Sequence, residues 1–61
     1  MIKKIWASST NHSIKNLRKL MHRRYGLVVE KIHHIKKLNQ KRDSDYLYEI
    51  QFDCRAMKRI R

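Results

Sequence analysis

The feature that most restricts the fold is a strict alternation of side chains over residues 46–57. Apolar or small side chains occupy every second position, and these are Tyr46, Tyr48, Ile50, Phe52, Cys54 and Ala56. The intervening positions are mostly polar, and these are Leu47, Glu49, Gln51, Asp53 and Arg55. A period of two is that of a β-strand. The segment is therefore predicted to be a strand with one apolar face, which needs a covering layer.

A second amphipathic segment, residues 13–25, supplies such a layer. At about 100° per residue, its apolar side chains gather on one side of a helix. They are Ile14, Leu17, Leu20, Met21 and Tyr25. Thr10 or Ser13 is the expected N-cap, and Gly26, the only glycine, is the expected left-handed C-cap. Residues 13–25 are therefore predicted to form a helix that packs on the strand's apolar face.

Two more segments are expected to be strands. Residues 2–7 alternate loosely and contain Ile-Trp, which favours a short first strand with Trp6 packed at the core or its rim. Residues 27–38 fit either a strand, in which a bulge near His33 and His34 restores the alternation, or a helix. The strand is preferred because its β-branched opening follows the helix stop at Gly26.

The joining and closing segments complete the chain. The turn-rich residues 39–45 are expected to form a loop that joins two segments of similar length as a hairpin. Residues 58–61 are expected to be either a strand extension or a mobile basic tail.

The order strand, helix, strand, strand predicts an α+β fold. We expect a two-layer sandwich in which one helix packs on a three-stranded, antiparallel-type sheet. The hairpin pairs strands two and three, and the strongly alternating third strand suits the centre, which gives the order 1-3-2. Residues 1–61 are expected to form a single small basic domain, because a chain of this length buries only a thin core. The thin core, the two edge strands and the open sheet face favour a homodimer.

Charge restricts the class of function more than any motif does. Sixteen lysines and arginines oppose five acids, so the formal net charge is +11. An excess of this size repels itself and is tolerated best beside a polyanion. Nucleic acid is the leading candidate, because each neutralised phosphate releases counterions. No residue predicts base-specific reading, so DNA and RNA fit equally well.

Predicted phosphate contacts fall into two clusters. The first is the exposed side of the helix, which contains no acid: Lys15, Arg18, Lys19, His22 and Arg23. The second surrounds the hairpin tip: Lys36, Lys37, Lys41 and Arg42. The open sheet face carries acids as well as cations, and these are expected to pair with each other.

Two other functions use the same residues. The first is a protein-interaction module or inhibitor that docks on an acidic protein surface through these cations. The second is a small ribonuclease, which needs a base, an acid and cations around a phosphate. Two sets of residues qualify: His22 with Lys19 and Arg23, and His34 with Tyr46 or Tyr48. Their spacing does not demand catalysis, so the chain is not expected to be an enzyme.

Neither a metal nor another cofactor is expected. The histidines show no convergent ligand spacing, and the adjacent His33 and His34 would point to opposite faces of a regular strand. Cys54 is expected in the core as a small hydrophobe. A single cysteine excludes an internal disulfide and fits a cytoplasmic location. No apolar run is long enough for a transmembrane helix, so no membrane contact is expected.

Overall fold

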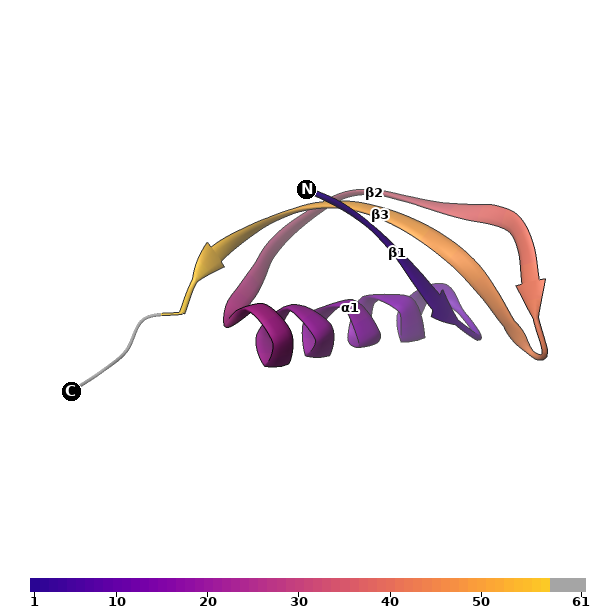
Figure 1. Ribbon diagram of the computed structural model, residues 1–61. Helices are drawn as coiled ribbons and strands as arrows, with labels where there is room; N and C mark the ends of the chain where they lie inside the picture. Colours follow the sequence, from indigo (N-terminus) through magenta and orange to yellow (C-terminus); the bar gives the residue numbers. More distant parts are fainter. Residues whose placement is uncertain (58–61) are drawn as a thin grey trace.

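The computed structural model describes residues 1–57 and contains one helix and three strands. In chain order these are β1 (Ile2–Ala7), α1 (Thr10–Tyr25), β2 (Leu27–Arg42) and β3 (Asp45–Ala56). The sheet has the order β1-β3-β2, and both neighbouring pairs are antiparallel. The sheet arches over α1, which lies on its concave side (Figure 1). The predicted α+β fold and sheet order are therefore confirmed, while both expectations for residues 58–61 lie outside the described residues.

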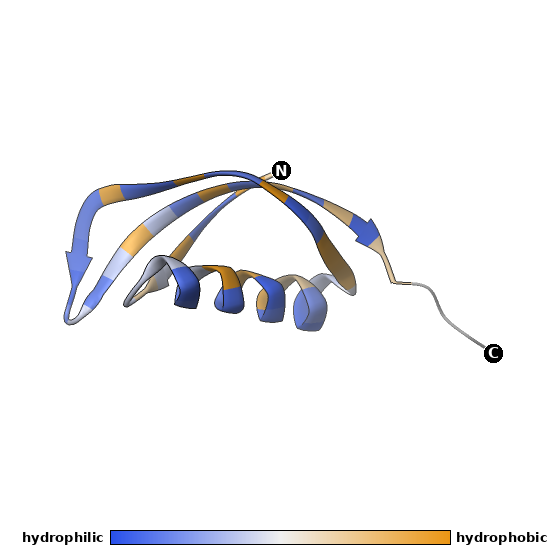
Figure 2. Ribbon diagram, turned by 180° about the vertical axis from the view of Figure 1, so that it is seen from behind, coloured by the Kyte–Doolittle hydropathy of each residue, from blue (hydrophilic) through white to orange (hydrophobic). Residues whose placement is uncertain are grey.

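The core lies between the sheet and α1. Leu17 and Met21, about one helical turn apart, are fully buried and belong to one cluster with the fully buried Ile50 and Phe52 of β3. Hydrophobic and hydrophilic segments alternate along α1 and the strands (Figure 2), as expected for elements that each bury one side. Tyr25 departs from the predicted apolar stripe. It ends the helix at the margin of the core, is 51% exposed and accepts a hydrogen bond from Lys3 Nζ at 3.1 Å.

The helix begins at Thr10, three residues earlier than predicted, and the predicted N-cap was wrong. Ser9 is the N-cap, and its Oγ accepts a hydrogen bond from the backbone N–H of His12 at 3.3 Å. Ser13 instead lies inside the helix, fully buried, and its hydroxyl donates to the carbonyl of Thr10 at 2.6 Å. A hydroxyl satisfied within its own helix can face the core without an unpaired polar atom.

Gly26 ends the helix as predicted. Its φ is 63°, in the left-handed region, and its N–H donates to the carbonyl of His22 at 3.2 Å. No atom lies within 4 Å of the position that a Cβ would occupy. The requirement for glycine therefore comes from the backbone conformation and not from crowding.

Gly26→Ala is expected to lower the free energy of unfolding by about 1–2 kcal/mol, the usual penalty for an L-residue in this conformation. Urea denaturation of both proteins measures the difference. Gly26→Asn is the matched control, because asparagine tolerates the left-handed region better and should lose less stability. An asparagine variant less stable than the alanine variant would contradict the backbone explanation.

β2 is a strand, as preferred, and it is longer than its partner. It has 16 residues against 12 in β3, and the extra residues lie at three register shifts. The shift between Ile32 and His34 is the predicted bulge. The shifts between Val29 and Lys31 and between Lys37 and Lys41 were not predicted.

The bulges explain why the β2 sequence was ambiguous. Val29, Ile32 and Ile35 are three residues apart, yet they pair with Cys54, Phe52 and Ile50 on the core face of β3. An extra residue between successive apolar positions turns a period of two into a period of three. Residues three apart also share one face of an α-helix, so the spacing of these apolar residues fits a helix as well as a bulged strand.

The hairpin loop is shorter than predicted. β2 continues to Arg42, which pairs with Asp45, so that only Asp43 and Ser44 remain as the turn. Asp43 has a φ of 54°, a left-handed conformation that aspartate tolerates. The prediction failed because the polar residues 39–42 have loop composition although they pair as a strand. β3 accordingly begins at Asp45 and ends at Ala56, one residue before the predicted end.

Candidate nucleic-acid interface

The exposed side of α1 carries the first predicted cluster. Its members are all exposed: Lys15, Arg18, Lys19, His22 and Arg23. Within residues 1–57 the only ion pairs are His33–Asp53 and Arg55–Glu30, so no helix cation is paired with a carboxylate there. Because α1 itself contains no acid, this face presents uncompensated positive charge.

A groove runs along this cationic side where α1 faces the start of β2. Its volume is about 480 Å³, and its lining comprises Arg18, Lys19, His22, Arg23, Leu27, Val28 and Val29. Four of the five predicted helix residues therefore border an apolar wall. No sequence pattern predicts the groove, because residues 27–29 indicate only the β-branched opening of a strand.

The second predicted cluster is divided between the two faces of the sheet. Lys36 pairs with Glu49, on the face away from α1, and Arg42 lies over Trp6 on that face. Lys37 pairs with Tyr48 and Lys41 with Tyr46, on the face that α1 covers. The residues are close in sequence, but the alternation of the strand and its last bulge separate their side chains.

Three of these cations form cation–π contacts with aromatic rings. Lys37 Nζ lies 3.7 Å from the centroid of the Tyr46 ring, and Lys41 Nζ lies 5.5 Å from it. The Arg42 guanidinium lies 4.6 Å from the ring of Trp6, which is half-buried as expected for rim packing. The sequence patterns place Tyr46 on the apolar face of its strand or beside His34 in the ribonuclease scheme, and neither prediction includes its position beneath two ammonium groups.

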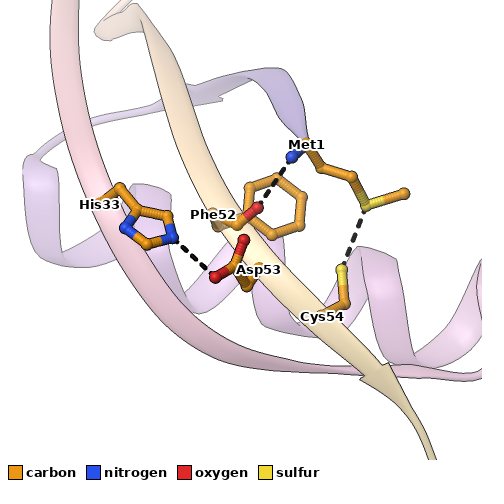
Figure 3. A network of polar contacts seen from close by, with 5 residues as sticks. All are labelled: Met1, His33, Phe52, Asp53 and Cys54. Carbon is orange, nitrogen blue, oxygen red and sulfur yellow. Dashed lines mark hydrogen bonds and ion pairs between the residues drawn. The ribbon is translucent and has the colours of Figure 1, made fainter.

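The open face of the sheet pairs some of its charges with each other, which confirms the prediction in part. His33 Nε2 lies 2.7 Å from Asp53 Oδ2 (Figure 3), and Arg55 Nε lies 3.3 Å from Glu30 Oε2. The hydrogen bond from His33 holds the pKa of Asp53 below its usual value. Local pairing leaves this face with mixed charge, in contrast to the exposed side of α1.

The bulge places both adjacent histidines on the open face. His33 reaches Asp53 there, and His34 pairs with Gln51, so the opposite orientation expected of adjacent residues in a regular strand does not apply at this bulge. Tyr46 and Tyr48 lie on the other face, and the sheet therefore separates His34 from both tyrosines of the ribonuclease scheme. The His22 set stays together on α1.

Met1 contacts two residues near the end of β3. The Met1 ammonium donates to the carbonyl of Phe52 at 3.0 Å, and Cys54 Sγ lies 3.2 Å from Met1 Sδ (Figure 3). Cys54 is half-buried and packs against the core cluster, less deeply than predicted. Among residues 1–57, no three His, Cys, Asp or Glu side chains gather closely enough to hold a metal ion.

Within the same described range, no helix has both the length and the apolar character that crossing a membrane requires. No protein-family model, no curated protein and no solved structure matches this chain. Its function is therefore inferred from the chemistry of its own surface.

Proposed function

We propose that this protein binds nucleic acid through the phosphate backbone, with the exposed side of α1 as the main contact. The observation that carries the proposal is the basic face of α1, which forms no ion pair within residues 1–57: Lys15, Arg18, Lys19, His22 and Arg23. Cations already neutralised by carboxylates would release few counterions from a nucleic acid. Free cations on a rigid helix release them and hold their spacing along the backbone.

The distribution of the acids supports the same proposal. All five lie after α1 in the sequence, on β2, on β3 or in the turn between them. Glu30 and Asp53 are paired with neighbours on the open face. A polyanion that approaches α1 therefore meets no carboxylate on the helix itself, and long-range steering favours this approach.

A titration of binding against salt tests the proposal. Fluorescence anisotropy with duplex DNA, single-stranded DNA and RNA should give affinities that fall steeply with salt. The four lysine and arginine contacts on a duplex predict a slope of about −3.6 in log K against log salt. A flat salt response, or no binding to any of the three at 50 mM salt, would reject the proposal.

A second candidate is a module that docks on an acidic protein surface. The groove beside α1 favours it, because its apolar wall at Leu27 and Val28 lies next to arginine and lysine side chains. A protein segment with both acidic and apolar residues would fit such a lining. Capture of one partner from lysate that survives nuclease treatment, with negligible affinity for free nucleic acid, would favour this candidate over the first.

A further inference from the structure

A second hollow lies near the hairpin tip, apart from the helix groove. Leu38, Asn39 and Gln40 lie between Lys37 and Lys41, which pair with Tyr48 and Tyr46, so these three residues face a single residue of β3. β2 bends sharply shortly before the tip (Figure 1). The resulting hollow has a volume of about 410 Å³. That size falls in the range of small-ligand sites, about 300–1,000 Å³.

The lining of this hollow has the groups that a nucleotide needs. One aromatic ring, two ammonium groups and two amide side chains border it, together with one aliphatic side chain: Tyr46, Lys37, Lys41, Asn39, Gln40 and Leu38. An aromatic ring stacks on a base, an ammonium group binds phosphate, and amides can hydrogen-bond the edge of a base. All three kinds of contact converge on one concave surface.

The two ammonium groups are the strongest sign of an anionic ligand. Lys37 and Lys41 approach the same Tyr46 ring at 3.7 Å and 5.5 Å, and neither is in an ion pair within residues 1–57. Two like charges beside one ring repel each other, and exposed cation–π contacts are individually weak. A phosphate between the two ammonium groups would remove the repulsion and attract both.

We propose that this hollow binds one unpaired nucleotide of the nucleic acid. The base stacks on Tyr46, and the flexible Lys37 side chain moves from the ring to the adjoining phosphate, which Lys41 also contacts. Asn39 and Gln40, both exposed, meet the base edge. A duplex keeps the faces of its bases stacked inside, so only a single strand, an overhang or a loop can fill the hollow.

This inference rests on the proposed function and adds a preference to it. The exposed side of α1 would bind any phosphate backbone, paired or unpaired. The hollow would add affinity only for unpaired nucleotides, whether ribose or deoxyribose. Lys37 and Lys41 lie on the sheet face that α1 covers, so the two sites belong to the same side of the sheet.

The test compares a blunt 12-base-pair DNA duplex, the oligonucleotide dT12 and the oligonucleotide rU12 at equal salt. The variant Tyr46→Leu keeps apolar bulk and removes the stacking ring. We expect it to lose about 5- to 150-fold in affinity for the single strands, the range for stacking of one base, and less than 2-fold for the duplex. A comparison of rU12 with dU12, which differ only in the sugar, shows which sugar the hollow prefers.

Tyr25→Leu is the matched control. Tyr25 also lies beneath a lysine, with Lys3 Nζ 5.0 Å from its ring centroid, but it is 51% exposed, whereas Tyr46 is half-buried, and it lines neither the helix groove nor the hollow. It should lose less than 2-fold for every probe. Equal losses of single-strand affinity in the two variants, or an unchanged single-strand affinity in Tyr46→Leu, would overturn the inference. Salt-dependent binding of the duplex would still support the proposed function in that case. Absence of binding to all three probes would instead reject the proposed function.

A second variant keeps the test informative if Tyr46→Leu unfolds. Lys37→Gln with Lys41→Gln changes two exposed side chains. The loss of two phosphate contacts should reduce the slope of log K against log salt on dT12 by about 1.4. On the blunt duplex the reduction should be smaller, because the hollow admits only unpaired nucleotides, and an equal reduction on both would overturn the inference.

Discussion

Replacing Lys15, Arg18 and Lys19 together by glutamine is expected to weaken duplex binding by a few hundred-fold at 0.1 M salt. Each lost phosphate contact lowers the salt slope by about 0.9, and three lower it by about 2.7. The electrostatic contribution to affinity vanishes near 1 M salt, which is one log unit above 0.1 M. A slope change of about 2.7 over that log unit corresponds to a loss of about 500-fold in affinity at 0.1 M. Glutamine has a helix propensity close to that of lysine and arginine, so the fold should persist.

The matched control removes equal charge from the open face of the sheet. Lys4, Lys31 and Arg55 are exposed there, and their replacement by glutamine also removes two lysines and one arginine. Either triple lowers the formal net charge of +11 by three. We expect the control to lose less than 10-fold, with circular dichroism showing both variants folded. Equal losses would mean that binding follows net charge and not the face of α1.

Ile50→Ala is expected to be one of the most destabilising truncations in the sheet. Ile50 is fully buried on the central strand, and such a truncation removes about 2–5 kcal/mol from the free energy of unfolding. A domain of this length has a total of only about 3–9 kcal/mol. Much of the variant population should therefore be unfolded at 37 °C, and urea denaturation at lower temperature gives the value.

Ile2→Ala is the control for this change, because it removes the same atoms from a strand residue that is 60% exposed. Exposed substitutions of this kind usually change stability by less than about 0.5 kcal/mol. The difference between the two variants thus measures burial and not strand propensity. Similar values for both would mean that the core is not centred on β3.

The sequence predicted the order of elements because β3 and α1 each obey one regular period. β3 alternates from Tyr46 to Cys54 with Leu47 as the one apolar exception, and the Leu17–Met21 side of α1 keeps helical spacing. A strong period on each of two segments leaves few ways to bury both apolar sides. The two-layer arrangement followed from this requirement.

The predictions that were wrong concern features that tertiary contacts determine and the local sequence leaves open. Several residues near the start of α1 can cap a helix; the structure has Ser9 as the cap, Thr10 as the first helical residue and Ser13 buried inside the helix. Polar residues at the end of β2 have loop composition, but pairing with β3 makes them strand. The bulges changed which face each side chain takes, and so divided the hairpin cations and placed Tyr46 beneath two lysines.

The candidate site was likewise predicted only in part. The cations of α1 were found because a helix of known phase fixes which residues are exposed. The hollow near the tip was not found, because it depends on three residues of β2 that face one residue of β3. Composition and periodicity contain no signal for such an insertion until the pairing register is known.

The irregular outer rim of β2 also limits how these chains can join. Each of its three register shifts breaks the even spacing of backbone donors and acceptors that another strand needs. The rim is therefore a poor template for fibre growth, although it is long and belongs to a protein of small stability margin. β1 pairs with β3 in unbroken register over six residues, so its outer rim is the place where another chain would add most readily.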